Sequence, residues 1–161
     1  MFRVGIGYDV HAFAPPGSGR PLILGGVLME GAPGLAGHSD ADVLIHSICD
    51  AVLGALGLGD LGRHFPDSDP EYKGVSSLVL LEKVGRLMSG QGYRLINIDA
   101  VVIAQRPKIA PQASEMSRRI SAALGATEAE VNIKGTSPEG LGALGRAEGI
   151  AAESIALIGK I

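Results

Sequence analysis

Cysteine is nearly absent from this 161-residue sequence, which contains only Cys49. An intrachain disulfide is therefore excluded, and a reducing compartment such as the cytoplasm fits best. The first residues lack the basic and apolar regions of a secretory signal, and no run approaches the ~18 uncharged apolar residues that a membrane span needs. We therefore expect a soluble, cytoplasmic protein with no membrane partner.

An excess of basic charge is also missing. The formal net charge is -3 and the pI of the sequence is about 5.8. Nucleic-acid binding depends on Lys and Arg side chains that neutralise phosphates, so we expect no nucleic-acid partner. An anionic small molecule would need local cations or metal ions.

Three common catalytic motifs are missing as well. Gly5-Ile6-Gly7 lacks the third glycine that a dinucleotide-binding loop would need at position 10, and no Gly-Lys-Ser/Thr phosphate loop occurs. Cys49 has apolar neighbours within a predicted helix, which does not favour a thiol nucleophile.

The composition is that of an ordinary globular protein, with 46% apolar and 19% charged residues. The length suits one domain, and no repeat or linker divides it, so we expect a single domain over residues 1–161. Glycine is frequent, with 24 residues, which indicates many tight turns and close backbone approaches.

Hydrophobic periodicity predicts strands that alternate with helices. Apolar residues alternate with polar ones or glycine from residue 2, which is typical of a half-buried strand over 2–11. Ser39 followed by Asp42 and then by apolar residues predicts a capped helix over 41–57. The rest of the chain is expected to form a long loop or lid at 58–75, helices over 76–90 and 111–124, and strands over 93–104, 131–136 and 147–158.

This order indicates an α/β (α+β) domain, a mixed sheet with helices packed on one face. The other face of the sheet would need a cover, and we expect another subunit to provide it. Ser137 and Pro138 have the residue types of a helix start. The strand over 93–104 is expected to place four apolar residues on one face: Ile96, Ile98, Ala100 and Val102.

Two polar side chains, Asp9 and His11, lie two positions apart on the first predicted strand. They project from the same face and could converge on one cation. Taken alone, the pair is explained more simply by a strand end with a hydrogen-bonded Asp and a solvated His.

A polar stripe on the predicted helix 41–57 adds to this pair. Asp42, His46 and Asp50 follow one another at i+4 steps, and the stripe faces either solvent or a polar site. In the second case His46 joins Asp9 and His11 as three ligands of a tetrahedral zinc with an open fourth position. One stripe carboxylate would then orient an imidazole.

Two segments could hold phosphate groups. His38 and Ser39 precede a helix whose free N–H groups favour an anion, although Ser39 could simply cap that helix. Thr136 and Ser137 could bond a diphosphate while Glu139 ligates Mg²⁺, although capping chemistry also explains this segment. Acidic residues of the predicted lid could accept substrate hydroxyls or form a plain turn: Asp60, Asp67 and Asp69.

The order and spacing of six motifs closely resemble the 2-C-methyl-D-erythritol 2,4-cyclodiphosphate synthase family over essentially the whole chain. The motifs are Tyr8-Asp9-Val10-His11, Gly37-His38-Ser39-Asp40-Ala41-Asp42-Val43 with His46, Leu58-Gly59-Asp60-Leu61-Gly62, Phe65-Pro66-Asp67-Ser68-Asp69-Pro70, Ala104-Gln105-Arg106-Pro107-Lys108 and Gly145-Arg146-Ala147-Glu148-Gly149-Ile150.

The resemblance implies a homotrimer with active sites between subunits, one zinc per site and Mg²⁺ or Mn²⁺ as a second divalent ion. It implies Asp9, His11 and His46 as zinc ligands and Glu139 as the ligand of the second ion. The catalytic residues would be His38 and Ser137, the latter standing where the family usually has Thr. The implied substrate contacts are Asp9, His11, His38, Ser39, Asp60, Gly62, Phe65, Asp67, Asp69, Ala104, Pro107, Lys108, Thr136, Ser137, Glu139 and Arg146.

The implied reaction belongs to the non-mevalonate route of isoprene biosynthesis. A phosphorus–oxygen lyase would convert 4-diphosphocytidyl-2-C-methyl-D-erythritol 2-phosphate to 2-C-methyl-D-erythritol 2,4-cyclodiphosphate and release CMP. The residues alone leave two alternatives open. One is a metal-dependent nucleotide hydrolase, and the other is a trimeric metal- or nucleotide-binding protein without turnover.

Overall fold

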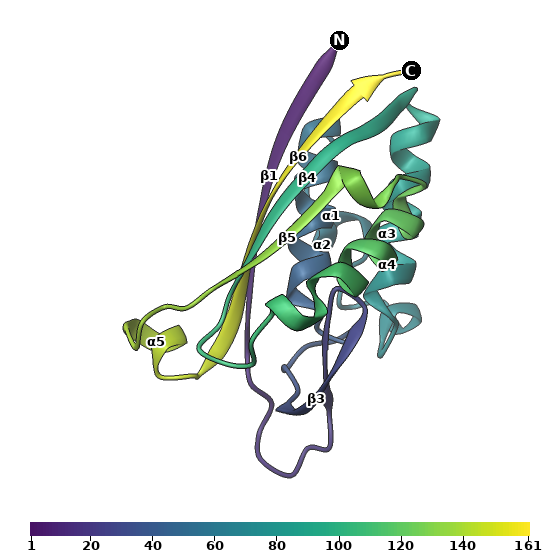
Figure 1. Cartoon of the computed structure of the whole chain (residues 1–161). Helices are drawn as coiled ribbons and strands as arrows, with labels where there is room; N and C mark the ends of the chain where they lie inside the picture. The colour runs from purple at the N-terminus through teal and green to yellow at the C-terminus, as the bar shows by residue number, and fades with distance from the viewer.

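A mixed four-stranded sheet lies at the centre of the fold (Figure 1). The computed structural model describes all residues, Met1–Ile161. Strands β1 (Phe2–Ala12), β6 (Gly149–Lys160) and β4 (Tyr93–Ile103) pair antiparallel in this order. Strand β5 (Val131–Thr136) then adds to β4 in parallel. The mixed sheet expected from the sequence is confirmed.

Three helices cover one face of this sheet, as Figure 1 shows. Helix α1 (Val43–Leu56) packs on β1 and β6, α3 (Ser77–Gly90) contacts α1 and β4, and α4 (Ala113–Leu124) packs on α3 and β5. Nearly every residue of α1 is buried, and its polar stripe therefore faces other parts of the protein. Between them, these layers enclose one continuous core.

Two glycines of β1 let α1 lie directly on the strand. A Cβ atom on Gly5 would stand 2.0 Å from the Ala51 carbonyl oxygen, and one on Gly7 would stand 1.9 Å from the Ser47 carbonyl oxygen. No side chain fits these distances. The Gly-x-Gly pattern therefore serves helix–strand packing, in agreement with the absence of a dinucleotide-binding motif.

The sequence analysis missed a hairpin formed by β2 (Pro21–Leu24) and β3 (Val27–Pro33). Its turn is fixed by Asp42, which accepts hydrogen bonds from Gly25 N at 2.9 Å and Gly26 N at 2.7 Å. Asp42 also accepts from Ile45 N and is therefore the N-cap of α1. The prediction that Ser39 caps the helix was wrong, because its hydroxyl accepts a hydrogen bond from Ala41 N, before the helix begins.

Other boundaries of helix 41–57 and of the loop 58–75 also differ in detail. Gly57 ends α1 in the left-handed conformation, as expected of a C-cap glycine. The loop contains two short helical turns, α2 (Leu61–His64) and η1 (Pro70–Tyr72). The third helix begins with η2 (Ala110–Gln112) and ends at Gly125, close to prediction.

Two local predictions were wrong. In β4 a bulge at Ile96 shifts the pattern, so Leu95 is buried where Ile96 was expected. Ser137 and Pro138 do not start a helix: the Ser137 hydroxyl accepts from Glu139 N, and Glu139 has a φ of 55°. This exposed turn precedes a later short helix, α5 (Gly142–Gly145), while η3 (Glu128–Glu130) precedes β5.

The face of the sheet opposite the helices carries an uncovered apolar surface at its β1 edge, whereas Asp99, Asn132 and Lys134 make its β5 edge polar. Five alternate residues of β1 are each between 49% and 71% exposed: Phe2, Val4, Ile6, Tyr8 and Val10. Ile155 of β6 pairs with Ile6 and extends this surface.

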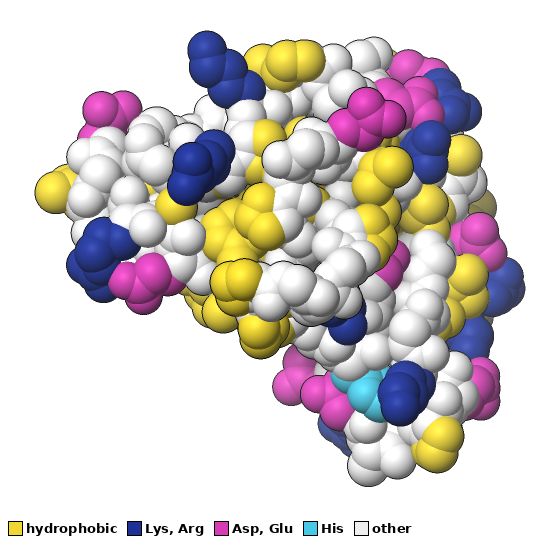
Figure 2. Space-filling view, turned by 90° about the horizontal axis from the view of Figure 1, so that it is seen from below, with side chains coloured by type: hydrophobic (Ala, Val, Ile, Leu, Met, Phe, Trp, Pro, Cys, Tyr) yellow, Lys and Arg dark blue, Asp and Glu magenta, His cyan; other side chains and the backbone are white.

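Charged side chains are arranged without a large region of one sign on the face seen in Figure 2. Lys and Arg alternate there with Asp and Glu. None of the helices combines the length and the apolar character needed to cross a membrane.

Candidate functional site

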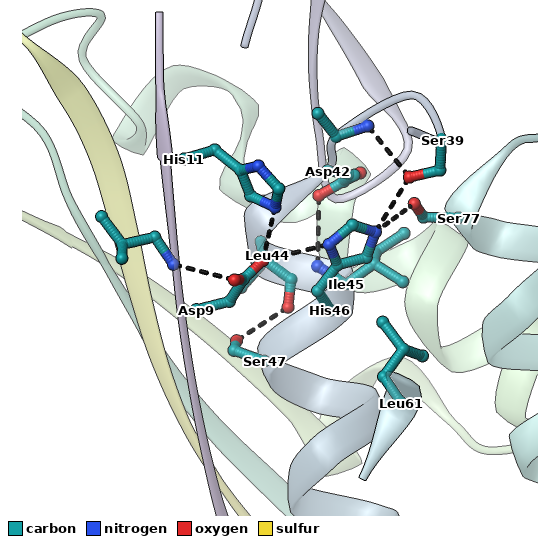
Figure 3. Close-up of polar contacts among 12 residues, drawn as sticks. Asp9, His11, Ser39, Asp42, Leu44, Ile45, His46, Ser47, Leu61 and Ser77 are labelled. Carbon is teal, nitrogen blue, oxygen red and sulfur yellow. Dashed lines mark hydrogen bonds and ion pairs between the residues drawn. The ribbon is translucent and has the colours of Figure 1, made fainter. Parts of the chain in front are cut away.

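Three side chains from β1 and α1 converge on one point (Figure 3). Asp9 Oδ2 lies 3.0 Å from His11 Nε2 and 3.0 Å from His46 Nδ1. One ligand atom from each residue lies within 4.8 Å of the other two. The alternation of the strand aims Asp9 and His11 at the helix layer, and α1 presents His46 to them.

The outward nitrogen of each imidazole determines which nitrogen can bind a metal. His11 Nδ1 lies 2.7 Å from the Ala36 carbonyl oxygen, which can only accept, so Nδ1 carries the proton. His46 Nε2 donates to the Ser77 hydroxyl at 2.9 Å, because that hydroxyl itself donates to Asp40. His11 Nε2 and His46 Nδ1 therefore face Asp9 and are the nitrogens left to bind a metal.

A stripe carboxylate does not orient either imidazole, contrary to the sequence-based prediction. Asp42 is fully buried at the helix cap, and Asp50 accepts from Leu61 N at 2.7 Å. The orienting acid for His46 is Asp40, which acts through Ser77. Since Asp42 and His46 are buried, the stripe does not face solvent.

The electrostatics of the cluster favour a negative carboxylate between two imidazoles. Burial works to raise the pKa of Asp9, but hydrogen bonds from His11 and His46 outweigh it and hold this pKa well below its usual range. The hydrogen bond to Asp9 raises the pKa of His11. Two imidazole nitrogens and one carboxylate oxygen form a donor set that suits a divalent transition metal.

The cluster lies in a pocket of about 430 Å³. Its walls come from β1, the loop before α1, α1 itself and the segment after it. The lining residues are Asp9, His11, Gly37, His38, Ser39, His46, Asp50, Asp60, Leu61, Gly62, Phe65 and Asp67. Small polar groups thus surround the cluster, at a volume that suits a small-molecule ligand.

A model of the YgbB family matches residues 2–159. The chain belongs to the YgbB family. The family expected from the motifs is confirmed by this match together with the relatives of that name.

Some relatives of this YgbB-family chain are about as long as the chain, and others are more than twice as long. It is 54% identical over 158 residues to the 2-C-methyl-D-erythritol 2,4-cyclodiphosphate synthase of Pelotomaculum thermopropionicum, covering 98% of this chain and 96% of the relative. It is 58% identical over 154 residues to the "Bifunctional enzyme IspD/IspF" of Anaeromyxobacter dehalogenans, covering 96% of this chain. The chain spans only 39% of that bifunctional relative.

A solved structure has the same fold. The Plasmodium falciparum protein described as an IspF CDP complex superposes with a TM-score of 0.86 at 33% identity, covering 99% of this chain and 96% of that one.

The remaining predicted site residues of the YgbB-family chain lie outside the pocket. Asp69 caps η1, and its carbonyl oxygen lies 3.4 Å from His38 Nε2. A second group gathers where the parallel strands β4 and β5 end, with Ala104 N bonded to the Thr136 carbonyl at 3.1 Å. This group contains Ala104, Pro107, Lys108, Thr136, Ser137 and Glu139. Arg146 ends α5 and pairs with Glu148 at 2.6 Å.

Sequence reasoning missed three groups that position the cluster. They are the Ser77 hydroxyl, the Asp40 carboxylate and the Ala36 carbonyl. The sequence analysis gave neither Ser77 nor Asp40 a role in the metal site. Their contact with His46 depends on how α3 packs beside α1, and no local pattern carries that information.

Proposed function

We propose that the chain converts 4-diphosphocytidyl-2-C-methyl-D-erythritol 2-phosphate to 2-C-methyl-D-erythritol 2,4-cyclodiphosphate and releases CMP. The observation that carries the proposal is the convergence of Asp9, His11 and His46 in a polar pocket of a YgbB-family chain. The cytoplasm is the proposed compartment, in keeping with the single, buried Cys49.

We propose zinc as the metal held by Asp9, His11 and His46. The orientation of both imidazoles supports this assignment, because the hydrogen bond on the far nitrogen of each ring directs the other nitrogen toward the Asp9 carboxylate. When bound there, a divalent ion would supply positive charge that stabilises phosphoryl oxygens.

Groups around the cluster would position the methylerythritol half of the substrate. His38 and Ser39 would hold the 2-phosphate at the pocket wall. Asp60 and Asp67 would accept hydrogen bonds from substrate hydroxyls, and Gly62 would leave room for them. Phe65 would cover the apolar carbon skeleton of the substrate. The Asp69 carbonyl would support His38. An anionic phosphate needs no general base, so orientation supplies most of the chemistry.

The second group would complete the site from a neighbouring subunit of a homotrimer. Ala104, Pro107 and Lys108 would frame the cytidine, and the relative described with CDP supports a cytidine diphosphate ligand. Thr136 and Ser137 would bond the diphosphate, and Arg146 would lie nearby. Glu139 would hold Mg²⁺ or Mn²⁺, a hard ion that prefers carboxylate oxygen. The uncovered apolar face of the sheet supports the trimer.

In this reaction an oxygen of the 2-phosphate attacks the β-phosphorus in line. The bond from that phosphorus to the bridging oxygen breaks, and CMP leaves with the electron pair. His38 and Ser137 would stabilise the charge that develops on the transferred group. Water takes no part.

Product analysis in ¹⁸O water, combined with a zinc assay, tests the proposal. Cyclisation predicts CMP and a cyclic product without solvent oxygen, whereas a hydrolase would incorporate it and a binding protein would form neither. His11→Ala should lose stoichiometric zinc and CMP release. His64→Ala is the matched control, because His64 bonds the Leu58 carbonyl outside the cluster. Normal zinc and CMP release in His11→Ala would contradict the proposal.

A further inference from the structure

A lysine of α3 lies against the outer side of the segment that forms one wall of the pocket. Lys83 Nζ lies 3.1 Å from Glu71 Oε1, 4.9 Å from the centre of the Tyr72 ring and 5.8 Å from the centre of the Phe65 ring. One ammonium group thus contacts three residues of segment 65–72. A carboxylate and two ring faces all attract a cation.

The same segment reaches the pocket from its other side. Phe65 is 8% exposed and lines the pocket together with Asp67. The Phe65 and Tyr72 rings pack edge to face, with centroids 5.4 Å apart. A shift of Tyr72 would therefore move Phe65, and with it the wall that faces the metal cluster.

The Phe65 ring packs into the hydrophobic core, and Phe65 N donates to the Leu61 carbonyl at 2.8 Å, but few polar side chains join the rest of the segment to other elements. On the pocket side, the Asp69 carbonyl oxygen lies 3.4 Å from His38 Nε2, a long hydrogen bond. Within the segment, the Asp69 carboxylate only caps its own turn by accepting from Glu71 N. Lys83 supplies the ion pair that joins the segment to helix α3.

We propose that Lys83 is a positioning residue that holds segment 65–72 in place as the wall of the substrate pocket. It contacts neither the metal cluster nor the pocket, so it acts through Phe65 and Glu71. The consequence for catalysis rests on the proposed function: Lys83 fixes the side chains that would meet the methylerythritol part of the substrate, and thereby sets KM more than kcat.

Hydrogen–deuterium exchange of the full chain tests the contact without any substrate. In Lys83→Met, which keeps an unbranched apolar stem and removes the ammonium group, amides of 66–75 should exchange three- to tenfold faster than in the unsubstituted protein. Lys83→Arg should restore slow exchange. Arg86→Met is the matched control, since Arg86 lies one turn further along α3 and makes no ion pair with the segment.

Kinetics of CMP release test the consequence. Lys83→Met should raise KM three- to tenfold, with kcat within twofold of its original value, and Lys83→Arg should recover KM. Unchanged exchange in Lys83→Met, equal acceleration in Arg86→Met, or an unchanged KM would overturn the inference. If no variant, including the unsubstituted chain, releases CMP, the proposed function fails, and the exchange rates still decide whether Lys83 holds the segment.

Discussion

At the scale of single residues, the ring nitrogens that face away from the cluster decide how the site works. An imidazole binds a metal through the nitrogen that lacks a proton, and the hydrogen bond on its other nitrogen selects which one that is. Ala36 performs this selection for His11 through a backbone carbonyl. Ser77 performs it for His46 and is itself polarised by Asp40.

Ser77→Ala should therefore weaken zinc binding by about tenfold, the lower end for loss of a group that orients a metal ligand. The reason is that His46 Nε2 keeps only the Ser39 hydroxyl, at 3.2 Å. Zinc titration against a competing chelator measures the change. Ser76→Ala is the control, because Ser76 makes no capping hydrogen bond. Equal zinc affinity in Ser77→Ala and the unsubstituted protein would contradict the role of this hydroxyl.

At the scale of elements, close packing of α1 on β1 aligns the metal ligands. Gly7→Ala would force a Cβ atom to within 1.9 Å of the Ser47 carbonyl oxygen, which belongs to the helix backbone and cannot rotate away. We expect destabilisation of about 3 kcal/mol or more, the upper end for overpacking. Urea denaturation measures this change. Gly90→Ala, where no atom lies within 4 Å, should leave stability unchanged or slightly raised. Similar unfolding midpoints for both variants would refute the packing argument.

The stability of the contact between α1 and the hairpin β2–β3, which Asp42 makes, should depend on pH. Burial, reinforced by the nearby charge of Asp40, raises the pKa of Asp42 to about 6. Hydrogen bonds from three backbone N–H groups lower this pKa but only partly offset the effect of burial. Because this pKa is higher in the folded state than the ordinary 3.8, the protonated group contributes stability below about pH 4 that is lost as pH rises through about 6.

Over that window the metal-free protein should lose about 3 kcal/mol of unfolding free energy relative to Asp42→Asn, which does not titrate there. Urea unfolding at pH 4, 5, 6 and 7 provides the comparison. Parallel pH profiles for the two proteins would show that Asp42 does not titrate in this range.

Periodicity in the sequence was sufficient to predict the strands of the main sheet and the helices that cover one of its faces. The pattern from Phe2 onward identified β1 and the pair Asp9 and His11, and the motifs identified the family. The bulge at Ile96 and the hairpin over 21–33 escaped, because a bulge and a hairpin turn fixed by Asp42 depend on tertiary contacts. For the same reason the sequence predicted a carboxylate that orients an imidazole but placed it in the polar stripe of the helix instead of at Asp40.

At the scale of the whole molecule, the uncovered face of the sheet should be the interface of a homotrimer. Ile6 is 63% exposed in the single chain, and Ile6→Glu would place like charges on an apolar interface. We expect this variant to be monomeric by sedimentation velocity while it still binds one zinc per chain, since all three ligands come from one chain. It should also lose CMP release, because the second group would come from the neighbouring subunit.

Val79→Glu controls for a new charge on an exposed apolar residue, since Val79 lies on α3, away from the sheet face. A monomeric unsubstituted protein, or a trimeric and active Ile6→Glu variant, would contradict the interface.

Phosphorus NMR tests the central claim most directly. The unsubstituted protein, zinc, magnesium and 4-diphosphocytidyl-2-C-methyl-D-erythritol 2-phosphate are followed together in one tube. The account predicts two mutually coupled resonances of a cyclic diphosphate that grow at the rate at which CMP appears. Unchanged substrate, or a linear phosphate product in place of the coupled pair, would contradict it.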